Sequence, residues 1–94
     1  MAYSTISNWV TTEWTDALEA VARDTFLPLI MGAGARRVQM IRTGEYSFTV
    51  VTEYADEDAA LAAQEKIAAI RSKAADELPM SMESATGGGV FAGG

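Results

Sequence analysis

Apolar and polar side chains follow two different repeats along the chain, and these divide it into two similar halves. Residues 2–12, 36–43, 46–54 and 80–85 are short runs in which the two kinds alternate, as is typical of β-strands. Residues 15–31 and 56–77 instead place apolar side chains three or four positions apart, which indicates amphipathic helices. The order β-α-β-β-α-β predicts an α+β domain, with a four-stranded antiparallel sheet and two helices on one of its faces.

The ends of the helices carry the expected capping signals. Thr15 and Asp56 are suitable N-cap residues, and acidic side chains follow each of them in the first turns, where the helix dipole favours negative charge. Pro28 lies inside the first helix and removes one backbone hydrogen bond there. We therefore expect that helix to kink at Pro28, or to end near Phe26 and restart as a short turn, before Gly32–Gly34 closes it.

Glycines set the expected turns in the rest of the chain. Thr43–Gly44 is predicted to be a two-residue hairpin link, with its glycine at positive φ. Three consecutive glycines, Gly87–Gly89, are unfavourable inside a strand, so we expect a bend or loop there, followed by a short docked segment at Val90–Phe91. The Gly-rich residues 87–94 belong to a single domain that covers residues 1–94.

The alternation assigns side chains to the two faces of the sheet. One face of the third strand is strongly apolar and should pack on the helices: Tyr46, Phe48, Val50, Thr52 and Tyr54. Its other face, with Thr49 and Val51, is mixed and should meet water or a second subunit. In the first strand, Trp9 lies opposite the face that holds Ile6, Asn8 and Val10. If that face meets the helices, Trp9 faces a second subunit, so Trp9, Thr49 and Val51 are candidate interface residues.

Composition narrows the class of protein. A chain of 94 residues cannot cover both faces of its own sheet, which points to self-association. The net charge of −6 repels phosphate backbones, so nucleic acid is not an expected partner. The absence of cysteine and histidine excludes disulfides, thiolate or histidine metal sites, and histidine catalysis. No run has the length of a membrane span and the start of the chain does not resemble a signal peptide, so we expect a cytoplasmic protein without membrane association.

Five polar or aromatic side chains are candidates for binding a ligand: Asn8, Trp14, Arg37, Tyr46 and Tyr54. Asn8 could orient a ligand carbonyl or hydroxyl, or it could bond to backbone at a loop. Trp14 could wall an aromatic pocket, or anchor the core or an interface. The hydroxyls of Tyr46 and Tyr54 could donate at two ends of a cavity, or lie at the rim of the core. Arg37 and Arg42 fall on opposite faces of the second strand, and one of them could meet an acidic ligand or a carboxylate of a partner chain. No set of acidic residues shows metal-ligand spacing, so no metal is expected.

The order of elements, the chain length and the tight central hairpin resemble the dimeric α+β barrel superfamily of ferredoxin-like topology. Within it, the chain is similar to the antibiotic biosynthesis monooxygenase-like group. The resemblance implies a homodimer in which two sheets meet across a two-fold axis. Haem-degrading members use an asparagine on the first strand with a tryptophan and a histidine. Asn8 is placed like that asparagine, but the missing histidine does not support haem degradation.

The resemblance also implies a function. Cofactor-independent oxygenases of the group surround an aromatic substrate with asparagine, tryptophan, tyrosine and arginine, and Asn8, Trp14, Tyr46 and Arg37 offer the same residue types. We therefore expect a small-molecule-binding protein that could oxygenate an aromatic substrate without a cofactor. The alternative is a non-catalytic binding or assembly module. A pocket of a few hundred cubic ångströms lined by Asn8 and a tryptophan would favour the first, and a cavity filled by core side chains the second.

Overall fold

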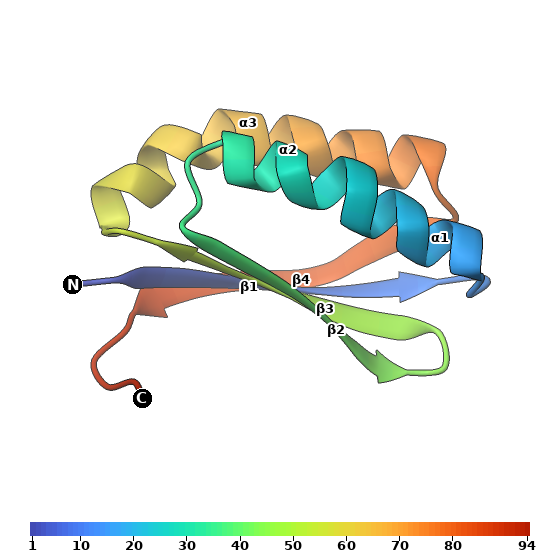
Figure 1. Cartoon of the computed structure of the whole chain (residues 1–94), viewed down its shortest axis with the longest axis horizontal. Coiled ribbons are helices and arrows are strands. Elements are labelled where there is room, and N and C mark those ends of the chain that lie inside the picture. Colours follow the sequence, from blue (N-terminus) through green and yellow to red (C-terminus); the bar gives the residue numbers. More distant parts are fainter.

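The computed structural model describes residues 1–94 and has the predicted architecture. A four-stranded antiparallel sheet has the strand order β2-β3-β1-β4, and all the helices lie on one of its faces (Figure 1). The expected first helix consists of three segments that follow one another without a break, α1, η1 and α2. The elements in chain order are β1 (Tyr3–Thr11), α1 (Asp16–Val21), η1 (Ala22–Phe26), α2 (Leu27–Gly32), β2 (Arg37–Gly44), β3 (Ser47–Tyr54), α3 (Glu57–Glu77) and β4 (Met80–Gly89).

The interruption expected near Pro28 takes the form of a wider helical turn. Thr15 caps α1, because its hydroxyl accepts a hydrogen bond from the N–H of Leu18 at 3.0 Å. Before the proline, η1 is a π-helical turn in which the N–H of Leu27 donates to the carbonyl of Ala22. A π-helical turn takes in one extra residue, so the chain absorbs the missing N–H of Pro28 without ending the helix.

The second helix, α3, begins as predicted. The carboxylate of Asp56 accepts a hydrogen bond from the N–H of Ala59 at 2.8 Å, and the helix ends before Leu78–Pro79. Ala63 and Ala74 are its two buried residues, and their small side chains let the helix approach the sheet closely. α3 is the longest helix at 21 residues, and no helix of the structure has the apolar length that a membrane crossing requires.

Two turns differ from the prediction. The hairpin link is Glu45–Tyr46, not Thr43–Gly44, and Gly44 pairs with Ser47 without taking positive φ. The positive φ occurs instead at Gly34, at 116°, after the end of α2. The register between β2 and β3 shifts at Thr43, and this irregularity moves the turn two residues along the chain.

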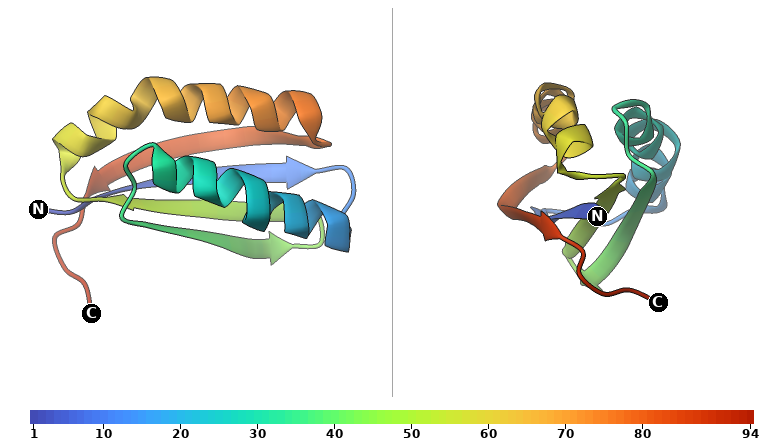
Figure 2. Two further views of the ribbon diagram at one scale, coloured as in Figure 1. Left: turned by 45° about the horizontal axis from the view of Figure 1, so that its top comes forward. Right: turned by 90° about the vertical axis from the view of Figure 1, so that its left-hand side faces the viewer.

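The glycine run also differs from the prediction, because β4 continues to Gly89 and pairs with residues 3–5 of β1. The expected bend or loop at residues 87–89 is therefore wrong. Val90 donates its N–H to the carbonyl of Ala2 at 2.8 Å and is docked as expected, whereas Phe91 is 93% exposed. The last residues extend away from the sheet on the side opposite the helices (Figure 2).

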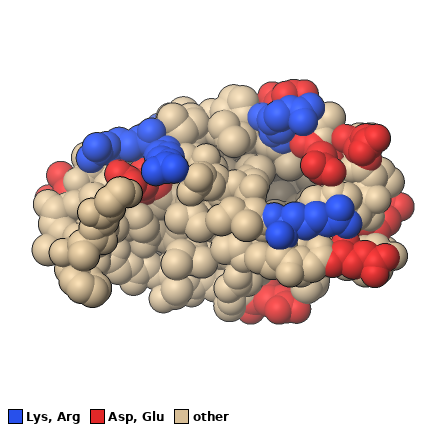
Figure 3. All heavy atoms as spheres, turned by 60° about the horizontal axis from the view of Figure 1, so that its bottom comes forward, with Lys and Arg blue, Asp and Glu red and all other residues tan.

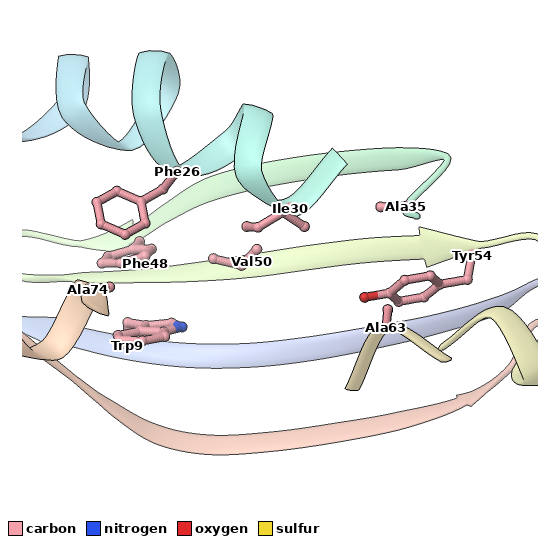
Figure 4. Close-up of a cluster of buried hydrophobic side chains, with 9 residues drawn as sticks. All are labelled: Trp9, Phe26, Ile30, Ala35, Phe48, Val50, Tyr54, Ala63 and Ala74. Atoms are coloured by element: carbon pink, nitrogen blue, oxygen red, sulfur yellow. The ribbon is translucent and has the colours of Figure 1, made fainter. Parts of the chain in front are cut away.

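The core lies between the sheet and the helices. Figure 4 shows its buried side chains, with Trp9 and Phe48 stacked at 6.0 Å between ring centroids and 9° between ring planes. Each buried aromatic or branched side chain contributes about 1.5–3 kcal/mol by leaving water, so these residues dominate the stability of the fold. The cluster consists of Trp9, Phe26, Ile30, Ala35, Phe48, Val50, Tyr54, Ala63 and Ala74.

Candidate functional site

The face of β1 that meets the helices is the opposite of the one assumed when Trp9 was predicted to lie at a subunit interface. Ser7, Trp9 and Thr11 face the helices and are buried, whereas Ile6 and Asn8 are on the face of the sheet without helices, which we call the open face. Trp9 is 6% exposed, and its indole N–H donates to the Ser7 hydroxyl at 2.9 Å. The placement of Trp9 at a subunit interface is therefore corrected: its side chain is in the core of its own chain.

Asn8 is held on the open face by its neighbours. Its amide nitrogen donates to Ser84 Oγ at 3.0 Å, and its oxygen accepts from Thr49 Oγ1 at 2.7 Å. A register shift in β4 leaves Glu83 between the partners of Asn8 and Trp9, and this brings Ser84 to the same face as Asn8. Two cavities between the sheet and the helices are bordered by an indole ring, one by that of Trp9 and the other by that of Trp14. Asn8 lines neither of them.

Trp14 lies between β1 and α1 and is fixed by three contacts. Its indole N–H donates to a carboxylate oxygen of Glu19 at 2.9 Å, and its ring meets the ring of Phe48 edge-on at 6.0 Å. The guanidinium carbon of Arg42 lies 4.2 Å from the centroid of the Trp14 ring. Arg42 in turn donates to the carbonyls of Gly44 and Glu45 at 3.2 and 2.8 Å. A cation–π contact thus joins the hairpin to the start of α1.

A pocket of about 270 Å³ opens beside this aromatic group, and we call it the Trp14 pocket. Apolar side chains form most of its wall, and its rim carries the charged groups of Glu19, Arg23 and Arg42. Arg23 forms an exposed ion pair with Asp24, whose hydrogen bond raises the pKa of Arg23. The pocket is lined by Trp14, Leu18, Glu19, Ala22, Arg23, Leu27, Met40, Arg42, Phe48 and Met80.

A smaller inner cavity of about 60 Å³ lies deeper between the sheet and the helices. It shares four lining residues with the Trp14 pocket, so the two are separated only by side chains: Ala22, Met40, Phe48 and Met80. Methionine is flexible, and rotation of Met40 and Met80 would join the two spaces. The inner cavity is mostly apolar, with the hydroxyls of Ser7 and Thr52 and the side chain of Arg71 on its wall.

The remaining predicted site residues are dispersed. Arg37 is exposed on β2, and Tyr46 is 49% exposed in the hairpin turn; neither lines the Trp14 pocket or the inner cavity. Tyr54 is buried in β3 beside Ala63 (Figure 4) and lines a separate groove along α3. Of the five predicted ligand-binding residues, only Trp14 borders the Trp14 pocket.

Sequence reasoning missed the inward-facing cation of α3. The helical pattern of residues 56–77 predicts Arg71 outside the apolar stripe, yet it is half-buried and lines the inner cavity. The signal was present, because Arg71 follows Ile67 by four positions and precedes Ala74 by three, which places all three on one helix face.

The open face of the sheet carries little charge across its middle (Figure 3). Thr49 and Val51 lie there on the central strand β3, next to Asn8 and Ile6 of β1. Ile6 and Ile41 are exposed apolar side chains of this face, 39% and 46% accessible. No three acidic side chains converge where they could share a metal ion.

Comparison with known proteins identifies the fold. No protein-family model matches the chain, and no curated protein matches it in sequence. A dimeric ferredoxin-like protein from an uncultured marine organism superposes with a TM-score of 0.68 at 14% identity, covering 99% of this chain and 97% of that one. The chain has the fold of the dimeric α+β barrel proteins.

Two further structures share this dimeric α+β barrel fold. An EthD-family protein from Bacillus halodurans has a TM-score of 0.71 at 16% identity, covering 97% of this chain and 100% of that one. SnoaB, a cofactor-independent oxygenase from Streptomyces nogalater, has a TM-score of 0.68 at 14% identity, covering 98% and 95%. At these identities the likeness establishes the fold and leaves the activity to be argued from the site.

Proposed function

We propose that the protein binds an electron-rich aromatic molecule in the Trp14 pocket, as a homodimer, and promotes its oxygenation without a cofactor. The observation that carries this proposal is a mostly apolar pocket of about 270 Å³, walled by Trp14 and Phe48 and separated from the inner cavity by side chains that include Met40 and Met80. This volume is close to the lower limit of small-molecule sites, and an apolar wall with a few polar groups is typical of them. The shared fold with SnoaB supports the choice of chemistry.

The residues around the pocket suit a substrate that reacts by itself. In cofactor-independent oxygenation, an ionised substrate is the reductant of dioxygen, and the protein orients it and removes water. The aromatic and methionine side chains would hold a flat ring, while Arg42 at the rim would balance the negative charge of an ionised hydroxyl. Hydrogen bonds to two backbone carbonyls hold Arg42 in place, and a charge that is already fixed would need little reorganisation when the substrate ionises.

Two observations favour the alternative of a non-catalytic binding module. The inner cavity holds only about 60 Å³, and the amide expected to orient a substrate, that of Asn8, is engaged on the open face. In this alternative the ligand binds in the Trp14 pocket but remains unchanged.

A binding and oxygen-uptake assay with hydroquinone-type compounds tests both the proposed oxygenation and the non-catalytic alternative. Calorimetry measures affinity for the wild-type protein, for Trp14→Ala, and for Tyr46→Ala as a control that removes an aromatic ring outside the pocket. We expect Trp14→Ala to weaken binding by about tenfold and Tyr46→Ala to leave it unchanged. An oxygen electrode then measures turnover. Binding without oxygen consumption would establish the non-catalytic module. Equal affinities of Trp14→Ala and Tyr46→Ala would refute the proposal that the ligand binds in the Trp14 pocket.

A further inference from the structure

A groove along α3, on the side towards β1 and β4, is larger than the Trp14 pocket. It has a volume of about 310 Å³, within the range of small-ligand sites. One stripe of α3 forms one wall, and residues of β1, β3 and β4 form the other. We call it the α3 groove, and its polar lining includes Tyr3, Thr5, Tyr54, Gln64, Arg71 and Thr86.

Arg71 is a cation in this groove without an acidic partner. No carboxylate oxygen lies within 4.0 Å of its guanidinium nitrogens, and the only ion pair in the structure joins Arg23 to Asp24. No hydrogen bond within the chain uses its guanidinium. The acidic residue of the groove, Glu57, is fourteen positions earlier on α3, about 21 Å along the helix axis. The end of the groove at Arg71 is therefore positively charged.

Tyrosine hydroxyls supply further donors to the groove. Tyr54 is 2% exposed, and its hydroxyl makes no hydrogen bond within the chain. The phenol of Tyr54 can donate a hydrogen bond at neutral pH, and burial raises its pKa further above that pH. Tyr3 lies across Gly87 of β4, where a Cβ would come within 2.8 Å of the Tyr3 hydroxyl. The strand glycine thus leaves the space that the Tyr3 ring occupies.

We propose that the α3 groove binds a small organic carboxylate, whose oxygens meet Arg71 and the tyrosine hydroxyls and whose apolar part lies against α3. A planar guanidinium matches a carboxylate in geometry, and charge-assisted hydrogen bonds are the strongest that side chains make. The apolar part of such a ligand would contact Ile67 and Ala68, within one helical turn of Arg71, on one side and Ala85 on the other. This groove shares no lining residue with the Trp14 pocket, although Ile67 and Arg71 also line the inner cavity. Its proposed ligand does not depend on the oxygenation proposed for the Trp14 pocket.

Benzoate and benzamide are a matched pair of probes, because they share a ring and differ in charge. We expect saturable benzoate binding to the wild-type protein by calorimetry and at least tenfold weaker binding of benzamide. Arg71→Met should weaken benzoate binding by tenfold or more. Lys73→Met removes the same charge from an exposed position of the same helix and should leave binding unchanged.

Two further variants keep the proposal testable if Arg71→Met does not fold. Arg71→Lys keeps the charge but loses the planar fork, and Tyr54→Phe removes one hydroxyl; each should weaken benzoate binding several-fold. The far-ultraviolet circular dichroism of every variant should match that of the wild type. Benzamide binding equal to benzoate, equal losses in Arg71→Met and Lys73→Met, or no saturable benzoate binding up to about 10 mM would each overturn the proposal.

Discussion

At the scale of single residues, Trp9 and Trp14 show how position decides what an indole does. They are five residues apart, yet Trp9 is buried with its N–H on Ser7, whereas Trp14 borders a pocket with its N–H on Glu19. The sequence placed both near the end of the first strand. It could not decide the face of Trp9, because Ile6 and Val10 make the opposite face of β1 equally apolar.

The buried phenol of Tyr54 gives a pH-dependent prediction. Burial raises its pKa above the ordinary value of 10.0, and the positive charge of Arg71 offsets part of this effect. Above pH 10.0 the unfolded chain loses this proton while the folded chain keeps it, so the folded state binds more protons. The stability that this difference contributes is present below that pH and is lost as the pH rises through the folded pKa.

We therefore expect the free energy of unfolding of the wild type to fall relative to that of Tyr54→Phe as the pH rises from about 9 to about 11. Urea unfolding at several pH values measures both proteins. The phenylalanine variant is the control, since it keeps every other ionisable group of the chain. Parallel curves would show that ionisation of Tyr54 does not contribute.

At the scale of elements, β4 shows why local propensity misled the prediction. Glycine weakens a strand, so Gly87–Gly89 indicated a bend. In the structure these residues pair with Tyr3–Thr5, and Gly87 provides room for the ring of Tyr3. The tertiary partner overrides the propensity, because β1 offers the glycines a full set of strand partners and Gly87 can approach Tyr3 more closely than a residue with a Cβ. Nothing in the sequence around the glycines indicates that partner.

The cap of α3 gives a prediction that depends on one hydrogen bond. Asp56→Ala removes the acceptor of the Ala59 N–H and should lower the free energy of unfolding by about 1 kcal/mol. Asp56→Asn keeps a side-chain oxygen at the N-cap and should lower it by a few tenths at most. Chemical denaturation compares the three proteins. An equal loss in both variants would mean that charge, and not the hydrogen bond, carries the effect.

At the scale of the whole molecule, the open face has no cover within one chain. The helices protect only the other face of the sheet (Figure 2), and Ile6 and Ile41 stand exposed among mostly uncharged neighbours. The structural relatives include dimeric ferredoxin-like proteins, which suggests a homodimer. We propose that a second copy covers the open face and that Thr49 and Val51, on the central strand β3, lie within the contact.

Charge placed in the middle of the open face should separate the subunits. Val51→Glu would bring one uncompensated carboxylate from each chain into the contact, and we expect the dissociation constant to rise by tenfold to a hundredfold, about 1.4–2.8 kcal/mol. Ala62→Glu adds the same charge on the exposed side of α3 and should remain a dimer. Sedimentation equilibrium measures both. A wild-type protein that is monomeric at micromolar concentration would contradict the proposed assembly.

The sequence by itself determined the order of the elements, the caps at Thr15 and Asp56, and the apolar face of β3, because each depends on neighbours a few residues away along the chain. Only the tertiary structure decided the faces of β1 and the continuation of β4 through its glycines. These depend on strand register and helix packing between residues far apart in the chain, as the hydrogen bond from Asn8 to Ser84 shows. A register shift of one residue in β4 was enough to move Ser84 to the open face, and no local pattern encodes it.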